Sequence, residues 1–237
     1  VEQREILMLL RRGVDVLMVA SCQQSLQDFY EPGDERTPYI LFDRNFSQVP
    51  AHFVGSDDVQ VGEIATEHLI DIGRTRIAHI GGKNTSPSVG RLNGYKKALA
   101  SHRLPVRAEA IVARDRVEET GDLQGFQAMQ ELLALKARPD AVFCYNDLTA
   151  VGAMEATLKA GLRIPEDIAF IGCGNFRYAD YLRVPLSSID HGTAELGRIA
   201  GEFALDLSAN PGQPVRSILT QSRLVVRESS VRASGSK

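Results

Sequence analysis

The sequence lacks any long apolar run, and it has no basic leader followed by an apolar core at its start. A helix that spans a bilayer needs about 20 mostly apolar residues, so the sequence predicts neither a membrane span nor a secretory signal. Hydrophobic residues make up 43% and charged residues 24% of the 237 residues, the balance of an ordinary globular protein. This length allows one large or two small domains.

Cysteine is scarce, with Cys22, Cys144 and Cys173 as the whole supply. An odd count does not suit a framework of paired disulfides. Cys144 and Cys173 also lie in or just after predicted strands, where free thiols behave as small buried hydrophobes. The sequence therefore predicts reduced cysteines in a cytoplasmic protein.

Basic clusters and catalytic motifs are missing too. The net charge is −3 and the Lys and Arg residues are scattered, so the chain has no basic stripe for nucleic acid. There is no G-x-S-x-G elbow, and Gly172-Cys173-Gly174 lacks the third glycine of a dinucleotide loop. Metal-ligand spacing is absent among His52, His68, His79, His102 and His191. We expect no enzyme activity, no metal and no cofactor.

The chain is organised around one strand–helix–strand unit. Ala141–Tyr145 has the length and composition of a strand buried on both faces. Asn146 and Asp147 then offer oxygens to the first N–H groups of a helix over Leu148–Ala160. A second buried strand follows at Ile168–Ile171. Such a unit predicts a parallel sheet with a right-handed crossover.

Similar alternation of strands and helices extends over most of the chain. We therefore predict an α/β fold with parallel sheets. Further strands are expected at 14–19, 39–42, 52–55, 76–80, 110–113, 187–189, 216–219 and 223–227, with helices near 1–11, 62–72, 92–99, 123–133 and 193–207, loops at 81–89 and 114–120, and an irregular segment at 176–185.

Polar side chains gather where the strands of the central unit end. Asn146, Asp147 and Asn175 all follow strands directly, and ligands of open α/β sheets bind at this carboxyl edge. Arg91 begins the helix after another strand, so its guanidinium can reach the same edge. From the sequence alone, Arg91 is either such a ligand-binding group or a surface arginine.

Several stretches together resemble one protein family. RRGVDVLMVA, TPYILFDR, GSDDVQVGEIATEHLIDIGRTRIAHIGG, GRLNGYKKAL, the central unit, PLSSIDHGTAELG and QSRLVVRESS follow one another in the order typical of that family. On these motifs the chain is identified as similar to the effector-sensing domain of LacI/GalR-family transcriptional regulators.

The resemblance implies two lobes of the type I periplasmic-binding-protein class, each with a parallel sheet, joined by three crossovers. The amino-terminal lobe would comprise residues 1–56 and 191–220, the carboxy-terminal lobe residues 57–190 and 221–230, and residues 231–237 would form a tail. It also implies that a helix-turn-helix headpiece for operator DNA, and the first strand and helix of the lobe, precede Val1.

The resemblance also carries over a set of effector-binding residues, with the effector held between the lobes. Arg91 of the R-L-x-G-Y motif and Asn146 of the N-D motif match most directly, with Asp147 shaping the same edge; Asp43, Ser56, Thr120, Asn175 and His191 complete the set. Relatives usually have an aspartate where this chain has Gly174, which argues against a sugar held in the usual way.

The main hypothesis is the effector-sensing domain of a repressor that binds a sugar or a related polar metabolite. A periplasmic sugar-binding protein of a transporter is the alternative, and the sequence before Val1 would discriminate between them. We also expect a homodimer that pairs through Val151, Met154, Leu158, Tyr181 and Leu182. Ala150, Ala153 and Ala160 are expected to give the same helix a second, small-residue surface for close approach.

Overall fold

The computed structural model describes every residue except 1, 22, 24–36, 47, 116–118 and 232–237. The chain forms two compact units. Unit 1 comprises Val1–Asp57, Asn84–Pro87 and Gly192–Gln221, and unit 2 comprises Asp58–Lys83, Ser88–His191 and Ser222–Lys237. Cys22 and nearly all of the predicted tail lie outside the described residues.

Unit 2 is built on a six-stranded sheet in the order β10-β8-β7-β6-β4-β5. Its strands are parallel except for β10, which pairs antiparallel with β8. The strands are β4 (Ile77–Gly82), β5 (Ile111–Arg114), β6 (Ala141–Cys144), β7 (Ala169–Cys173), β8 (Ser187–Asp190) and β10 (Arg223–Val225). Every residue of β6 is buried, as are those of β7, which confirms the prediction of strands covered on both faces.

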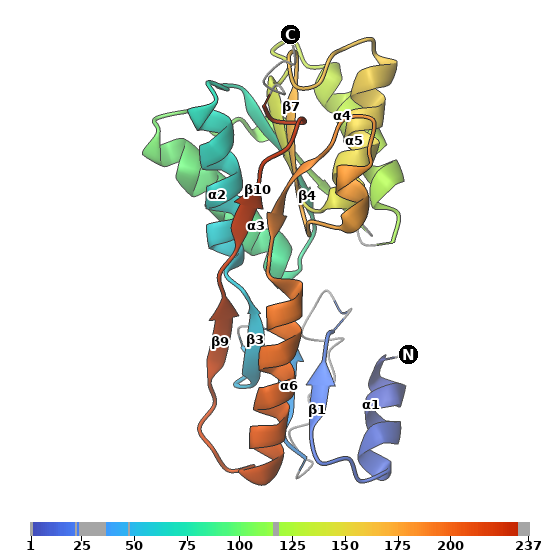
Figure 1. Ribbon diagram of the computed structural model, residues 1–237, viewed down its shortest axis with the longest axis vertical. Helices are drawn as coiled ribbons and strands as arrows, with labels where there is room; N and C mark the ends of the chain where they lie inside the picture. Colours follow the sequence, from blue (N-terminus) through green and yellow to red (C-terminus); the bar gives the residue numbers. More distant parts are fainter. Residues whose placement is uncertain (1, 22, 24–36, 47, 116–118, 232–237) are drawn as a thin grey trace. The chain divides into compact units, whose positions relative to one another are not determined.

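Helices cover both faces of the unit 2 sheet (Figure 1). On one face, α2 (Asp58–Asp71) and α3 (Ser86–Ser101) supply Val61, Leu69 and Tyr95 to the core. On the other face lie α4 (Gly121–Leu133) and α5 (Asp147–Lys159). Short 3₁₀ turns, η2 (Ala108–Ala110) and η3 (Arg177–Asp180), precede β5 and follow β7. The predicted α/β class with parallel sheets is thus confirmed.

Glycines let α4 and α5 cross with their backbones in contact. A Cβ on Gly125 would lie 2.0 Å from the carbonyl oxygen of Thr149, and one on Gly152 would lie 1.8 Å from that of Asp122. No side chain larger than a hydrogen atom fits at these distances. The two glycines therefore allow the short distance between the helix backbones.

Unit 1 has a four-stranded parallel sheet in the order β1-β2-β3-β9. Its strands are β1 (Leu17–Val19), β2 (Tyr39–Phe42), β3 (His52–Ser56) and β9 (Ser217–Thr220). Alternate residues of β2 face opposite sides, where Leu41 packs with α1 (Glu2–Arg11) and Ile40 packs with α6 (Thr193–Ala209).

Three local predictions were wrong. The loop predicted at 81–89 is shorter, because Gly81 and Gly82 extend β4 and α3 already begins at Ser86, where Pro87 can occupy the first turn without losing a hydrogen bond. The irregular segment 176–185 contains η3. The strand predicted over 14–19 starts only at Leu17, after a turn through Gly13 with φ +70°.

A fourth correction concerns the small residues of α5. Ala150 and Ala153 are completely buried in the core shared with α4, so they are not available to a second copy of the chain. These small residues do allow close approach, but the approaching helix is α4 of the same chain and not a second copy. Ala160, the last of the three, is exposed.

Candidate functional site

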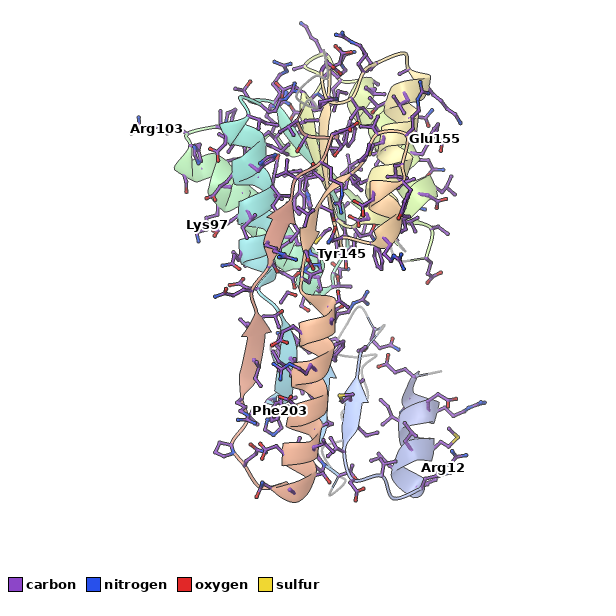
Figure 2. The ribbon with its side chains drawn as sticks, in the orientation of Figure 1. Arg12, Lys97, Arg103, Tyr145, Glu155 and Phe203 are labelled. Atoms are coloured by element: carbon purple, nitrogen blue, oxygen red, sulfur yellow. The ribbon has the colours of Figure 1, made fainter. Side chains whose placement is uncertain are left out.

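The candidate site begins at the carboxyl end of β6, where Asn146 follows the strand by two residues and caps α5. The Asn146 backbone is extended, at φ −144° and ψ 174°, and its Oδ1 accepts a hydrogen bond from the Thr149 N–H at 2.8 Å. This confirms the predicted cap at Asn146. Tyr145, the preceding residue, is labelled at this end of the sheet in Figure 2.

Arg91 lies in the second turn of α3, not at its start, and its guanidinium is held on three sides. Nε donates to Asp58 Oδ1 at 2.9 Å, and Nη1 donates to the Tyr145 carbonyl oxygen at 2.6 Å. The guanidinium carbon also lies 4.8 Å from the centroid of the Tyr145 ring. These contacts orient a buried cation at the carboxyl edge of the unit 2 sheet.

His191 adjoins that guanidinium, and Cys173 adjoins His191. His191 Nε2 lies 3.5 Å from Arg91 Nη2 and 3.1 Å from Cys173 Sγ. Burial, together with the positive charge of Arg91, lowers the pKa of His191 to about 3. The imidazole is therefore neutral near pH 7, and it is a hydrogen-bonding group and not a second cation.

Asp147 is completely buried in the first turn of α5. Its Oδ1 accepts a hydrogen bond from Ser188 Oγ at 2.5 Å, and its Oδ2 accepts one from the Phe176 N–H at 2.9 Å. Burial raises the pKa of this carboxyl, while the two donors oppose that shift. Asp147 thus fixes the segment that follows β7, and it positions this edge of the sheet.

Asn175 stands at the start of that segment with φ +48°. Its N–H donates to Ser188 Oγ at 2.9 Å, and its Oδ1 accepts a hydrogen bond from Arg227 Nη2 at 2.8 Å. Ser188 therefore joins Asp147 and Asn175 in one network.

Arg227 is a residue that the sequence did not single out. Besides Asn175, its guanidinium binds Asp180 Oδ1 at 2.5 Å and the Leu186 carbonyl oxygen at 2.8 Å. It comes from the segment after β10, 52 residues beyond Asn175. No local spacing could have predicted that partnership.

The remaining predicted effector residues are distributed over both units. Asp43 is exposed with φ +64° in unit 1, and Ser56 is buried at the end of β3 in the same unit. Thr120 is partly buried at the cap position of α4, without a capping bond from its side chain. The structure brings Arg91 to His191, and it joins Asp147 to Asn175; a role in effector binding stays a prediction for all eight residues.

Four of the five predicted dimer residues line an apolar hollow on unit 2. Val151, Met154, Leu158 and Leu182 line it together with Glu155, Arg183 and Val184. Met154 belongs mainly to the core of unit 2, whereas Tyr181 is 80% exposed. Glu155 is labelled on α5 in Figure 2. Pairing through this surface stays a prediction.

His68 and His79 make hydrogen bonds within unit 2. His68 Nε2 pairs with Ser230 Oγ at 2.9 Å, and His79 Nδ1 pairs with the Phe143 carbonyl oxygen at 3.0 Å. Cys144 and Cys173 are both buried, as predicted. Among the described residues, no group of three or more His, Cys, Asp or Glu could hold a metal ion. In that same part of the chain, no helix is long and apolar enough to cross a membrane.

Comparison with known proteins shows which families this chain resembles. Residues 66–230 match the family model of a periplasmic binding protein-like domain. The chain is 34% identical over 228 residues to the ribose operon repressor of Haemophilus influenzae, covering 96% of this chain and 67% of that protein. It is 32% identical over 201 residues to the probable HTH-type transcriptional repressor ExuR of Bacillus subtilis, covering 84% and 59%.

Solved structures of transcriptional regulators have the same fold as this chain. The transcriptional regulator CelR in complex with cellobiose superimposes with a TM-score of 0.84 at 28% identity, covering 96% of this chain and 69% of that one. A regulatory protein of the LacI family from Chloroflexus aggregans gives a TM-score of 0.83 at 28% identity, covering 97% and 82%. Across the most similar curated relatives, the chain spans about half to two thirds of their length.

Proposed function

Because the chain belongs to the LacI family of transcriptional regulators, we propose that it is the effector-sensing and dimerisation part of a repressor. A small polar metabolite would bind to it and change the affinity of the whole protein for operator DNA. Its curated relatives are repressors, which favours this function over that of a transporter's periplasmic binding protein. An operator-binding regulator works in the cytoplasm, and it needs no catalytic group.

The observation that carries the proposal is the placement of Arg91. Asp58 and the Tyr145 carbonyl hold its guanidinium at the carboxyl edge of the unit 2 sheet, where ligands of open α/β sheets bind. A planar guanidinium fixed in this way can donate paired hydrogen bonds to ligand hydroxyls or to a carboxylate. His191 is a neutral polar group beside it, and Asn146 directly follows Tyr145.

Replacing Arg91 with alanine is expected to weaken effector binding about tenfold or more, because a hydrogen bond to a charged group contributes about 1.5–3 kcal/mol. Isothermal titration with a ligand found in a thermal-shift screen of sugars and sugar acids would measure this. Arg163→Ala is the matched control, since Arg163 is an exposed arginine paired with Asp167. Equal affinity in Arg91→Ala and the wild type would show that Arg91 is not an effector ligand.

The 237 residues by themselves are expected not to bind operator DNA. Their net charge is −3 without a basic stripe, and phosphate contacts by Lys and Arg supply most of the affinity of proteins for DNA. We propose that the operator contacts lie in a part of the whole protein outside these residues. A gel-shift comparison of this chain with the full-length protein, on DNA from upstream of its own gene, tests the division; a sequence-specific shift by the chain alone would refute it.

We further propose that the whole protein is a homodimer, with the apolar hollow bounded by α5 and the segment after η3 at the interface. Leu158, Leu182 and Val184 line the hollow, and Tyr181, which directly precedes Leu182, is highly exposed. Aromatic and aliphatic groups gathered on a surface mark protein interfaces, in which charged residues are depleted at the centre.

Tyr181→Asp is expected to convert this dimer to monomer, because a buried carboxylate without a partner is strongly disfavoured at an interface. Analytical ultracentrifugation of the full-length protein at micromolar concentration would follow the change. The control is Leu123→Asp, which places the same charge at another exposed apolar site, on α4. A variant at Tyr181 that still sediments as a dimer would place the interface elsewhere.

A further inference from the structure

Phe176 and Tyr178 form an exposed aromatic stack on the segment after β7. Their ring centroids lie 5.7 Å apart at an interplanar angle of 9°. Phe176 is 56% exposed and Tyr178 is 38% exposed. Aromatic rings carry large apolar faces, so a parallel pair left open to solvent is a surface suited to a further flat group.

The backbone that carries this stack is fixed before any ligand arrives. The Phe176 N–H donates to Asp147 Oδ2, and the Asn175 N–H donates to Ser188 Oγ. Arg227 holds the Asn175 side chain from the other direction. A surface ordered in advance loses little conformational freedom on binding, which favours affinity.

Gly174 lies between the aromatic stack and the residues of the candidate effector site. Its φ is +125°, and a Cβ there would lie only 2.8 Å from Cε2 of the Phe176 ring. The ring therefore fills the space that a side chain at position 174 would need. Gly174 directly follows Cys173, whose sulfur lies 3.1 Å from His191 Nε2, and His191 in turn adjoins Arg91.

We propose that Phe176 determines effector specificity by stacking against an aromatic ring of the effector, with Tyr178 behind it. This inference rests on the proposed effector-sensing function, and it adds the chemical class of the ligand. Position 174 offers no side chain, and both oxygens of the nearby Asp147 are engaged within unit 2. This part of the site therefore suits an apolar ring face better than a cluster of hydroxyl donors.

Phenyl and methyl β-D-glucopyranoside test the proposal, because they differ only in the group attached to one sugar. The wild type is expected to bind the phenyl compound about two- to tenfold more tightly, the range for a stacked aromatic pair. In Phe176→Ala this preference should disappear, and in Phe176→Leu it should shrink. The chain has no tryptophan, so Phe176→Trp provides a single tryptophan, which can be excited selectively over tyrosine and whose emission the phenyl compound, but not the methyl compound, should change.

Each other result counts against the inference. Equal affinity for the two glycosides, or binding of neither, would overturn it. If Phe176→Ala keeps the phenyl preference while Arg91→Ala abolishes binding of both compounds, the effector-sensing function stands and the stacking role falls. If Phe176→Ala changes only the sedimentation of the full-length protein, the ring belongs to an interface with a second copy and the proposal is refuted.

Discussion

Replacing Gly152 with alanine is expected to lower the free energy of unfolding of unit 2 by about 3 kcal/mol, at the upper end of the usual cost of overpacking a core. The new Cβ would lie 1.8 Å from the carbonyl oxygen of Asp122 and 2.6 Å from its carbonyl carbon. Both atoms belong to the backbone of α4, so no side chain can rotate away. Only a shift of one helix relative to the other relieves the overlap.

Gly197→Ala provides the control in urea denaturation followed by circular dichroism. Gly197 lies within α6, and apart from its neighbours and the backbone of α6 itself, no atom of the described residues lies within 4 Å of the position of a Cβ there. This substitution is expected to stabilise unit 1 by about 0.5–1 kcal/mol, because alanine has less conformational freedom to lose in a helix. Hydrogen exchange should localise the damage of Gly152→Ala to α4 and α5. Unchanged protection of both helices would contradict their close crossing.

Replacing Asp147 with alanine is expected to destabilise unit 2 by about 2–6 kcal/mol, since each of the two buried donors left without a partner costs about 1–3 kcal/mol. Ser188 Oγ and the Phe176 N–H are the donors that would lose their acceptor. Asp122→Ala is the matched control, because Asp122 also lies in the first turn of a helix but is exposed. Its cost should stay below about 1 kcal/mol. Equal denaturation midpoints for the two variants would show that the Asp147 network contributes little.

The same carboxyl gives a pH dependence with a defined sign. Burial raises the pKa of Asp147 in the folded protein above its ordinary value of 3.8. The folded state therefore binds more protons than the unfolded state between these two pKa values, and this contribution to stability falls as the pH rises through that window. Asp147→Asn lacks the titrating group, so the difference in unfolding free energy between the wild type and this variant should change across the window. A pH-independent difference would contradict the raised pKa.

The sequence alone determined the class of the fold, because burial on both faces leaves a direct trace in composition. Ala141–Cys144 and Ala169–Cys173 are runs of apolar or small residues, and such runs are typical of parallel strands with helices on both sides. The cap at Asn146 was predictable for a related reason, since it depends on a hydrogen bond to a residue three positions away. Local periodicity and local hydrogen bonding can be read along the chain.

Only the tertiary structure decided which distant groups meet. Arg91 contacts Asp58 and Tyr145, and Asn175 contacts Arg227, across separations of 33, 54 and 52 residues. The small residues of α5 were visible in the sequence, but whether α4 or a second copy would pack on them was not. The sequence specifies which surfaces can come close, because side-chain size is a property of each residue. Which surfaces do come close depends on the packing of the whole chain, because partners far apart in the sequence are chosen by three-dimensional fit.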